Sequence, residues 1–281
     1  MTHTTTRSAE LEEALGPGSP IVVLDKVSLA FDDTVILSDV SFTLITGQTK
    51  IILGASGAGK STILKLILGL LKADSGVIWV NGERVDNMSE LELMKVRADL
   101  GMVFQEGALF DSLTVAENVG YKLFEEMHQP ADEVRRRVEE VLGFIGLAEY
   151  IDKMPSELSG GQRRRVAIAR AMAAKPRVLL YDEPTTGLDP ITATTVDEEI
   201  VKLRDLENVS SIVVTHQLRD AFYVATHEAV RERQSIQIAP ADAAKSEEAE
   251  FIMLKDGRVL FEGHSAELRA SKDPYIREFL S

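Results

Sequence analysis

Nine consecutive residues, GASGAGKST, have the types and spacing that bind phosphate. They fit the pattern G-x-x-x-x-G-K-[ST], in which Lys60 supplies a positive charge and Ser61 a hydroxyl. Glycines let backbone N–H groups approach an anion closely, and the start of a helix favours negative charge. A hydroxyl in this position suits a Mg²⁺ ion that bridges the outer phosphates. The pattern predicts a nucleotide site formed by Gly54, Ala55, Ser56, Gly57, Ala58, Gly59, Lys60, Ser61 and Thr62.

Two adjacent carboxylates form the second candidate group. Asp182 and Glu183 end the apolar run VLLYDE, which is typical of a buried strand. Neighbouring residues on a strand point to opposite faces, so the two carboxylates are expected to have different tasks. We assign Asp182 to the magnesium shell, and Glu183 to orienting the attacking water or taking its proton. Because ligands gather at the carboxyl ends of parallel strands, both should lie near the phosphate loop.

The elements around these motifs predict an α/β fold. A short buried strand, Ile51 to Leu53, precedes the phosphate loop, and an apolar helix, Thr62 to Leu71, follows it. The alternating stretch 21–45 predicts a β-hairpin that turns at Asp32 and Asp33. Further segments predict strands at 77–80, 100–104, 178–181 and 211–214, a helical region at 114–174 broken near 129–130 and 154–155, and helices at 192–206 and 217–226. This order predicts a parallel core that carries two lobes.

Composition limits the class of protein. The 281 residues carry a formal charge of -14, which disfavours a general nucleic-acid binder because phosphate neutralisation needs a basic face. No apolar run reaches the roughly 18 residues needed to cross a bilayer. The first twenty residues lack the apolar core of a signal peptide, and there is no cysteine. We therefore expect a cytoplasmic location.

A third motif, LSGGQ at 158–162, opens a basic helix with two glycines after a serine. Together with the phosphate loop and VLLYDEP, it resembles the ATPase subunit of ATP-binding-cassette (ABC) proteins. The resemblance runs from about residue 21 to 226 and resumes at Phe251. It implies a P-loop NTPase with a RecA-like parallel core, an antiparallel β lobe and an α-helical lobe. ATP and Mg²⁺ are the implied substrate and cofactor.

The resemblance also implies site residues that spacing alone does not reveal. Two copies pair head to tail in this family, so that the LSGGQ residues Ser159, Gly160 and Gly161 would contact ATP held by the partner. Gln105 matches a loop glutamine that binds near Mg²⁺ and contacts the membrane partner, and His216 matches a switch histidine at the γ-phosphate. Asp189 matches a loop that crosses the dimer, and Phe31 lies where an aromatic ring stacks on adenine. Of the basic runs, 163–165 is expected to border the nucleotide interface, and 135–137 to be a solvated helix face.

Two stretches resemble one subfamily in particular. FQEGALFDSLTVAENV (104–119) and YDEPTTGLDPIT (181–192) are similar to the ATPases of Mla/Mce-type phospholipid transporters, as is the ending DPYIREFLS. Such ATPases work on the cytoplasmic face of the inner membrane with a permease, an MCE-domain protein and often a STAS-domain protein. One departure is Gln162, where the subfamily often has methionine.

The remaining boundaries complete the expected organisation. Residues 1–20 are expected to be a mobile tail with one helical turn at 10–15, followed by a single ATPase domain, 21–281. Within it we expect a helical subdomain at about 106–174 and a hairpin around Asp256 and Gly257. A last helix at 273–281 should be capped by Asp273, and its apolar face docks on its own domain or on a partner.

The segment at about 227–250 departs from the family pattern. Its alanine, proline and charge content predicts an exposed loop, either a tolerated insertion or a docking arm for a regulatory partner. Three other functions compete with lipid transport: an ABC motor for a different cargo, a soluble ABC mechanoenzyme, and a regulatory subunit that binds ATP without catalysis. A single cassette and an acidic balance argue against the second. The intact Lys60, Asp182, Glu183 and His216 argue against the third.

Overall fold

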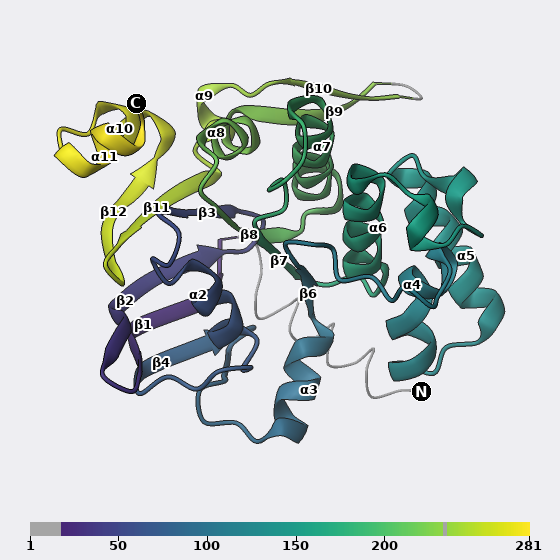
Figure 1. The fold of residues 1–281 in the computed structure, drawn as a ribbon, viewed down its shortest axis with the longest axis horizontal. Helices are drawn as coiled ribbons and strands as arrows, with labels where there is room; N and C mark the ends of the chain where they lie inside the picture. The colour runs from purple at the N-terminus through teal and green to yellow at the C-terminus, as the bar shows by residue number, and fades with distance from the viewer. Residues whose placement is uncertain (1–17, 233–234) are drawn as a thin grey trace.

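The computed structural model describes residues 18–232 and 235–281, and Figure 1 shows their arrangement. The strands are β1 (Pro20–Phe31), β2 (Thr34–Ile45), β3 (Thr49–Gly54), β4 (Ser75–Val80), β5 (Glu83–Arg84), β6 (Leu100–Val103), β7 (Val178–Asp182), β8 (Ser210–Thr215), β9 (His227–Glu232), β10 (Ser235–Pro240), β11 (Ala249–Lys255) and β12 (Arg258–His264). The α-helices are α2 (Lys60–Ile67), α3 (Glu90–Ala98), α4 (Val115–Tyr121), α5 (Ala131–Phe144), α6 (Gly160–Ala173), α7 (Pro190–Glu207), α8 (Leu218–Thr226), α9 (Ala243–Ser246), α10 (Ser265–Ala270) and α11 (Pro274–Phe279).

A six-stranded sheet in the order β12-β11-β3-β8-β7-β6 forms the centre of the molecule (Figure 1). Neighbours from β11 to β6 are parallel, and β12 pairs antiparallel with β11 at the edge. Every residue of β3 and β8 is buried. This is the pattern of parallel strands covered on both faces. The expected parallel core is confirmed, with one antiparallel edge strand added.

The two faces of this sheet bury two separate hydrophobic clusters. Ile51 and Leu53 of β3 point into a cluster shared with α4 to α8, whereas Ile52 points into a cluster shared with α2 and the antiparallel sheet β2-β1-β4-β5. Alternation along one strand therefore joins both lobes to the core. The predicted hairpin turning at Asp32 and Asp33 is confirmed, as is the β lobe. In the described part of the chain, no helix is both long and apolar enough to span a bilayer.

The helix after the phosphate loop is shorter than the sequence predicted. It ends at Ile67 rather than Leu71, and Gly69 has a left-handed backbone with φ of 65°. A left-handed glycine is a common helix terminator. The guanidinium of Arg97 donates to the carbonyls of Leu68 (2.7 Å) and Gly69 (3.2 Å), so α3 satisfies the free carbonyls at the end of α2.

Helix α3 was not predicted, and the segment Lys122–Glu126 lies in the predicted helical region but has π-helical geometry. Ser89 and Glu92 form a capping box at the start of α3, which is the signal that could have found this helix. The π segment continues α4 directly, and its first residue, Lys122, donates to the carbonyls of Arg97 (2.9 Å) and Ala98 (3.2 Å). The helical lobe is thereby tied to the end of α3.

The prediction of an exposed loop at about 227–250 is wrong. Strands β9 and β10 form an antiparallel hairpin here, followed by α9. Two adjacent residues of α7 hold its base, because Arg204 donates to the carbonyl of His227 (2.6 Å) and Asp205 accepts from the amide of Ala229 (2.8 Å). The alternation in SIQIAP is the strand signal that composition concealed.

Helix α11 packs against the core of its own domain. Asp273 accepts hydrogen bonds from the amides of Tyr275 and Ile276, so the predicted cap of α11 is confirmed. Ile276 is buried in the cluster under α4 to α8, with Phe279 packed against it. Of the two alternatives for the apolar face, docking on the same chain is the one observed. The helical turn expected at 10–15 lies outside the described residues.

A pair of buried carboxyl groups joins α7 to α8. Asp197 is 1% exposed and Asp220 is 3% exposed, and within the described residues the Oδ2 atom of each has no hydrogen-bond donor. Burial, followed by the charge of Asp220, raises the pKa of Asp197 to about 9. Arg219 donates to Asp220 (2.7 Å), whereas no cation contacts Asp197 within the described residues, so we assign the bound proton to Asp197.

This arrangement predicts a stability that falls with pH. Asp197 in the folded state, with a pKa of about 9, binds a proton that the unfolded chain releases near pH ~4. The free energy of unfolding should therefore fall as the pH rises between these values, and level off above them. Asp197→Asn, which is neutral at every pH, should flatten this slope and make the protein more stable at about pH 8. Urea unfolding across this range measures the slope.

The exposed Asp152→Asn is the control and should keep the slope of the parent protein. Equal slopes for the parent and Asp197→Asn would contradict the assignment of the proton to Asp197.

Candidate nucleotide site

The phosphate loop connects the end of β3 to the start of α2, as the sequence predicted. Gly54 is the last residue of β3, and Lys60 is the first residue of α2. Gly59 precedes the helix with φ of 97°, and a Cβ there would lie 2.6 Å from Cδ2 of Leu37. Both the backbone and the packing therefore require glycine, because β2 presses against the loop. The result is an open turn at the positive end of a helix.

Lys60 lies inside this turn. Its Nζ donates to the carbonyls of Gly54 (2.9 Å) and Ala55 (3.1 Å), and it lies 3.5 Å from Oε1 of Glu183. The side chain is buried, so its charge is poorly screened by solvent. A buried ammonium at the N-terminal end of a helix favours a phosphate anion.

Ser61 and Asp182 form the candidate cation site. The Ser61 hydroxyl donates to Oδ1 of Asp182 at 2.7 Å, which joins the first turn of α2 to the end of β7. A hydroxyl and a carboxylate are hard oxygen ligands of the kind that Mg²⁺ prefers, usually with phosphates and waters in the remaining positions. The residues present therefore fit Mg²⁺, and Gln105 is exposed on the loop after β6.

The backbone separates Glu183 from Asp182 in a way that the sequence did not reveal. Strand β7 ends at Asp182, and Glu183 has a left-handed backbone with φ of 50°. From the sequence alone, strand alternation was the expected cause of the different directions of the two carboxylates. This reason is wrong, because Glu183 lies outside the strand. A non-glycine residue held in this region costs on the order of 1–3 kcal/mol, and such residues cluster at functional sites. The amide of Glu183 donates to Val214 O (2.9 Å), which fixes the turn.

The carboxylate of Glu183 contacts side chains from three segments. The side chain of His216 places Nδ1 2.8 Å from Oε2, and Thr186 donates to the same oxygen at 3.0 Å. Lys60 contacts the other oxygen. The residue is 8% exposed, whereas the side chain of His216 is 50% exposed. A carboxylate with a fixed orientation and one solvent-facing partner can orient a water molecule and accept its proton.

The LSGGQ residues start α6. Ser159 caps the helix by accepting from the amide of Gln162 (3.3 Å), and the Gln162 side chain accepts from the amide of Ser159 (2.8 Å). This is a reciprocal capping box, and it gives Gln162 a structural task that methionine could not perform. Ser159 and Gly160 are exposed, whereas Gly161 is buried against Thr192 of α7.

Other predicted residues lie on separate segments. Asp189 caps α7, and hydrogen bonds from Thr192 lower the pKa of its carboxyl. Phe31 ends β1 with its ring half exposed. Within residues 18–232 and 235–281, no hydrogen bond or ion pair joins Phe31, Gln105, Ser159 or Asp189 to the cluster of Lys60, Ser61, Asp182, Glu183 and His216.

Sequence reasoning missed the residues that hold the loop after β6. The buried amide of Asn118 accepts from the backbone N–H of Phe110 (2.8 Å) and donates to its carbonyl (3.0 Å). Arg170 of α6 donates to the carbonyls of Gly107 (2.9 Å) and Ala108 (2.7 Å). Asn118 lies in the stretch 104–119 that resembles the lipid-transport subfamily, but that resemblance assigned it no role, and Arg170 was assigned none either. The expectation that 163–165 borders the nucleotide interface stays a prediction.

Comparison with known proteins places these features in a family. The family described as ABC transporter matches residues 37–186. The intermembrane phospholipid transport system ATP-binding protein MlaF of Escherichia coli K12 is 34% identical over 260 residues, covering 92% of this chain and 88% of that protein. The sulfate/thiosulfate import ATP-binding protein CysA of Gloeobacter violaceus is 37% identical, covering 92% and 74%. A dimeric structure of the ATP-binding cassette MJ0796 with ADP and Pi superposes with a TM-score of 0.70 at 31% identity, covering 86% of this chain and 98% of that one.

The two glycines of LSGGQ are expected to differ in how well they tolerate a side chain. A Cβ on Gly161 would lie 2.0 Å from Cγ2 of Thr192, whereas on Gly160 it would meet nothing closer than 3.5 Å. Gly161→Ala should therefore destabilise the protein by about 1–3 kcal/mol through overpacking. Gly160→Ala should be neutral or slightly stabilising, because alanine favours a helix. Urea denaturation measures both.

Adding Thr192→Ser removes the clashing methyl group and should restore most of the stability lost in Gly161→Ala. If Gly160→Ala and Gly161→Ala lose the same stability, the packing of α6 on α7 is not the cause.

Proposed function

The chain belongs to the ABC transporter family and is an ATPase subunit of that family, and from this premise we propose that it drives phospholipid transport between bacterial membranes. The match to MlaF along 92% of this chain is the observation that carries the lipid assignment. The segments 104–119 and 181–192, which lie on either side of α6, support it. The similar extent of the match to CysA makes a different cargo the second candidate.

We assign ATP binding and hydrolysis to the cluster at the ends of β3, β7 and β8. The phosphate loop and Lys60 bind the phosphates, and Phe31 stacks on the adenine. Ser61, Asp182 and Gln105 would hold Mg²⁺, which would supply positive charge to the phosphates. Glu183 orients the attacking water and accepts its proton, while His216 holds the carboxylate of Glu183 and contacts the γ-phosphate. The 3.5 Å pair of Lys60 and Glu183 supports this proposal, because a bound phosphate competes for Lys60 and releases the base.

The proposed active form is a head-to-tail dimer. Ser159, Gly160 and Gly161 start α6, where free amides and the helix dipole favour an anion. In Figure 1, α6 and α2 lie in different parts of the molecule, so the LSGGQ helix suits a nucleotide on a second copy. The similarity to the dimeric cassette structure supports this pairing, with Asp189 near the boundary between copies.

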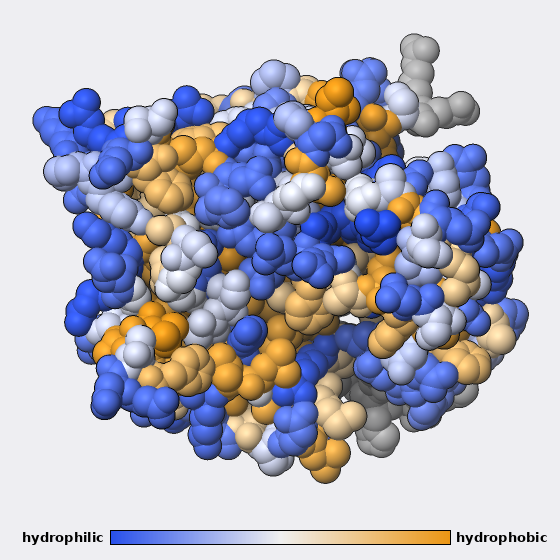
Figure 2. Space-filling view, in the orientation of Figure 1, coloured by the Kyte–Doolittle hydropathy of each residue, from blue (hydrophilic) through white to orange (hydrophobic). Residues whose placement is uncertain are grey.

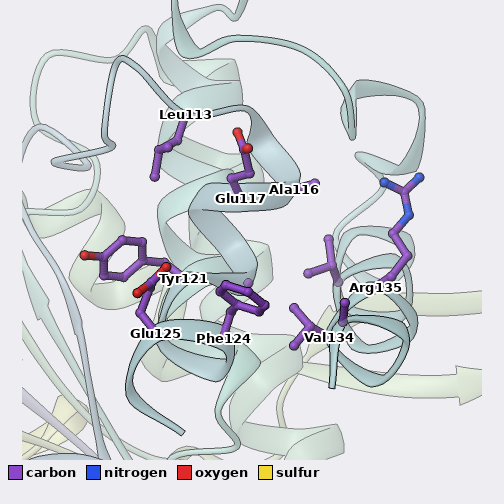
Figure 3. Close-up of a pocket in the computed structure, with 11 residues that line it drawn as sticks. Leu113, Ala116, Glu117, Tyr121, Phe124, Glu125, Val134 and Arg135 are labelled. Atoms are coloured by element: carbon purple, nitrogen blue, oxygen red, sulfur yellow. The ribbon is translucent and has the colours of Figure 1, made fainter. Parts of the chain in front are cut away.

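A membrane permease is the proposed second partner. Leu91 and Met94 on α3 are 72% and 60% exposed, and Figure 2 shows a hollow between the core and the helical lobe. On the lobe, α4, the π segment and α5 enclose an apolar groove of about 380 Å³, which Figure 3 shows with Tyr121, Phe124 and Val134 around it. We propose that a cytoplasmic helix of the permease binds in this groove of the helical lobe. The chain would then lie peripherally on the cytoplasmic face of the inner membrane. An MCE-domain protein, and in some systems a STAS-domain protein, would complete the transporter.

The proposed role of Glu183 predicts a separation of binding from turnover. Glu183→Gln should keep ATP affinity and lower the turnover number by about a hundredfold or more, because an amide cannot accept the proton from water. Steady-state ATPase rates and a nucleotide-binding titration measure the two effects. Glu149→Gln on the exposed surface of the helical lobe is the matched control. Equal turnover numbers for the parent and Glu183→Gln would remove this role.

The cargo is tested by purifying the chain with its partners from native membranes in mild detergent, followed by mass spectrometry. We expect a permease, an MCE-domain protein and bound phospholipid. The complex should also move labelled phospholipid between vesicles with ATP, and the Glu183→Gln complex should not. A permease that brings a sulfate- or amino-acid-binding protein would keep the ATPase and reject the lipid. Ribosomal or DNA-repair partners would reject transport itself.

A further inference from the structure

Arg164 is a buried guanidinium that joins two loops of the site. It lies on α6 and is 6% exposed. Its Nη1 donates to the carbonyl of Phe104 at 2.9 Å, and its Nη2 donates to the carbonyl of Thr186 at 3.2 Å. Within the described chain these are its only hydrogen-bond partners, so each terminal nitrogen holds a different loop.

Both carbonyls belong to functional segments. Phe104 directly precedes Gln105, the proposed ligand near Mg²⁺. Thr186 lies between β7 and α7, its hydroxyl donates to Glu183 (3.0 Å), and Asp189 follows it by three residues. Arg164 therefore connects the surroundings of the chain's own ATP with α6, which begins directly after Ser159.

Only an arginine can make this connection. Its planar group presents several donors in a fixed geometry, whereas a lysine ammonium is a single point charge. Burial lowers the pKa of the guanidinium, and the nearby carboxylate of Glu106 partly offsets this cost. A charged group is expensive to desolvate, so its position between two loops needs a compensating role. Arg170, which lies later on α6, donates to Gly107 and Ala108 of the loop that follows Phe104.

We propose that Arg164 is a positioning residue that couples the two ATP sites of the dimer, an inference that rests on the proposed head-to-tail pairing. A shift of Gln105 or Glu183 when ATP binds moves the carbonyls of Phe104 and Thr186. Arg164 passes this movement to α6, and hence to Ser159, while the Thr186 segment passes it to Asp189. Both residues face the nucleotide of the partner copy, so each site responds to the occupancy of the other.

The test is the ATP dependence of hydrolysis by the complex purified from native membranes. The parent complex should be cooperative, with a Hill coefficient approaching about 2 for two coupled sites. Arg164→Lys keeps the buried charge but reaches one carbonyl at a time, and should lower the Hill coefficient to about 1 while changing ATP affinity by less than about threefold. A merely structural role would lower the rate or the stability without changing the Hill coefficient.

Arg165→Lys is the matched control, because Arg165 is the next residue on α6 and donates to the carbonyl of Ile145 without touching either loop. It should stay as cooperative as the parent. Arg164→Gln is the second variant, to be used if thermal unfolding shows that Arg164→Lys does not fold, and it should lose cooperativity in the same way.

The outcomes separate this inference from the function on which it rests. A cooperative parent with an equally cooperative Arg164→Lys overturns the role of Arg164 and leaves the dimeric ATPase intact. Hydrolysis by the parent complex with a Hill coefficient of about 1 overturns the coupling and leaves the ATPase intact, because two paired sites that act independently give the same coefficient. Loss of cooperativity in both Arg165→Lys and Arg164→Lys also overturns the role of Arg164. Any substitution in α6 would then have the same effect.

Discussion

The carboxylate of Glu183 is the point on which the site depends. It is nearly buried, and such a charge is tolerated only where partners satisfy it. Lys60, Thr186 and His216 do so from the phosphate loop, the loop after β7 and the end of β8. One carboxylate therefore connects three segments that are distant in sequence. These contacts also hold Glu183 in its strained left-handed backbone conformation.

Helix α6 has the corresponding role outside the cluster. Its arginines donate to backbone carbonyls of the loops on either side, at Phe104, Gly107, Ala108 and Thr186. Backbone carbonyls cannot be removed by substitution, so the connection tolerates sequence variation in the loops themselves. A helix that starts at the LSGGQ motif is thus fixed to the segments around the proposed ATP site of its own chain, while Ser159 and Gly160 at its start are exposed.

Long-range contacts also explain the two largest errors of the sequence interpretation. The segment after α8 has the composition of a loop, but Arg204 and Asp205 satisfy the backbone where β9 begins, and the hairpin β9–β10 forms. Helix α2 stops early because Gly69 has a left-handed backbone. Arg97 of α3 then caps α2 by donating to the carbonyl of Leu68. In both places side chains from another helix satisfy the backbone, and those contacts are not visible in a local pattern, although the alternation in SIQIAP is.

The sequence by itself determined the phosphate loop, the cap of α11, the hairpin β1–β2, the parallel core and the ABC ATPase family. The first three follow from consecutive residues or a regular period, the parallel core follows from the order of strands and helices, and the family follows from the resemblance of three motifs. Only the tertiary structure decided that Lys60 meets Glu183, that Asp197 is buried near Asp220, and that Arg164 bridges Phe104 and Thr186. Arg164 and Phe104 are 60 residues apart, and a contact at that separation depends on how the helices pack rather than on any motif.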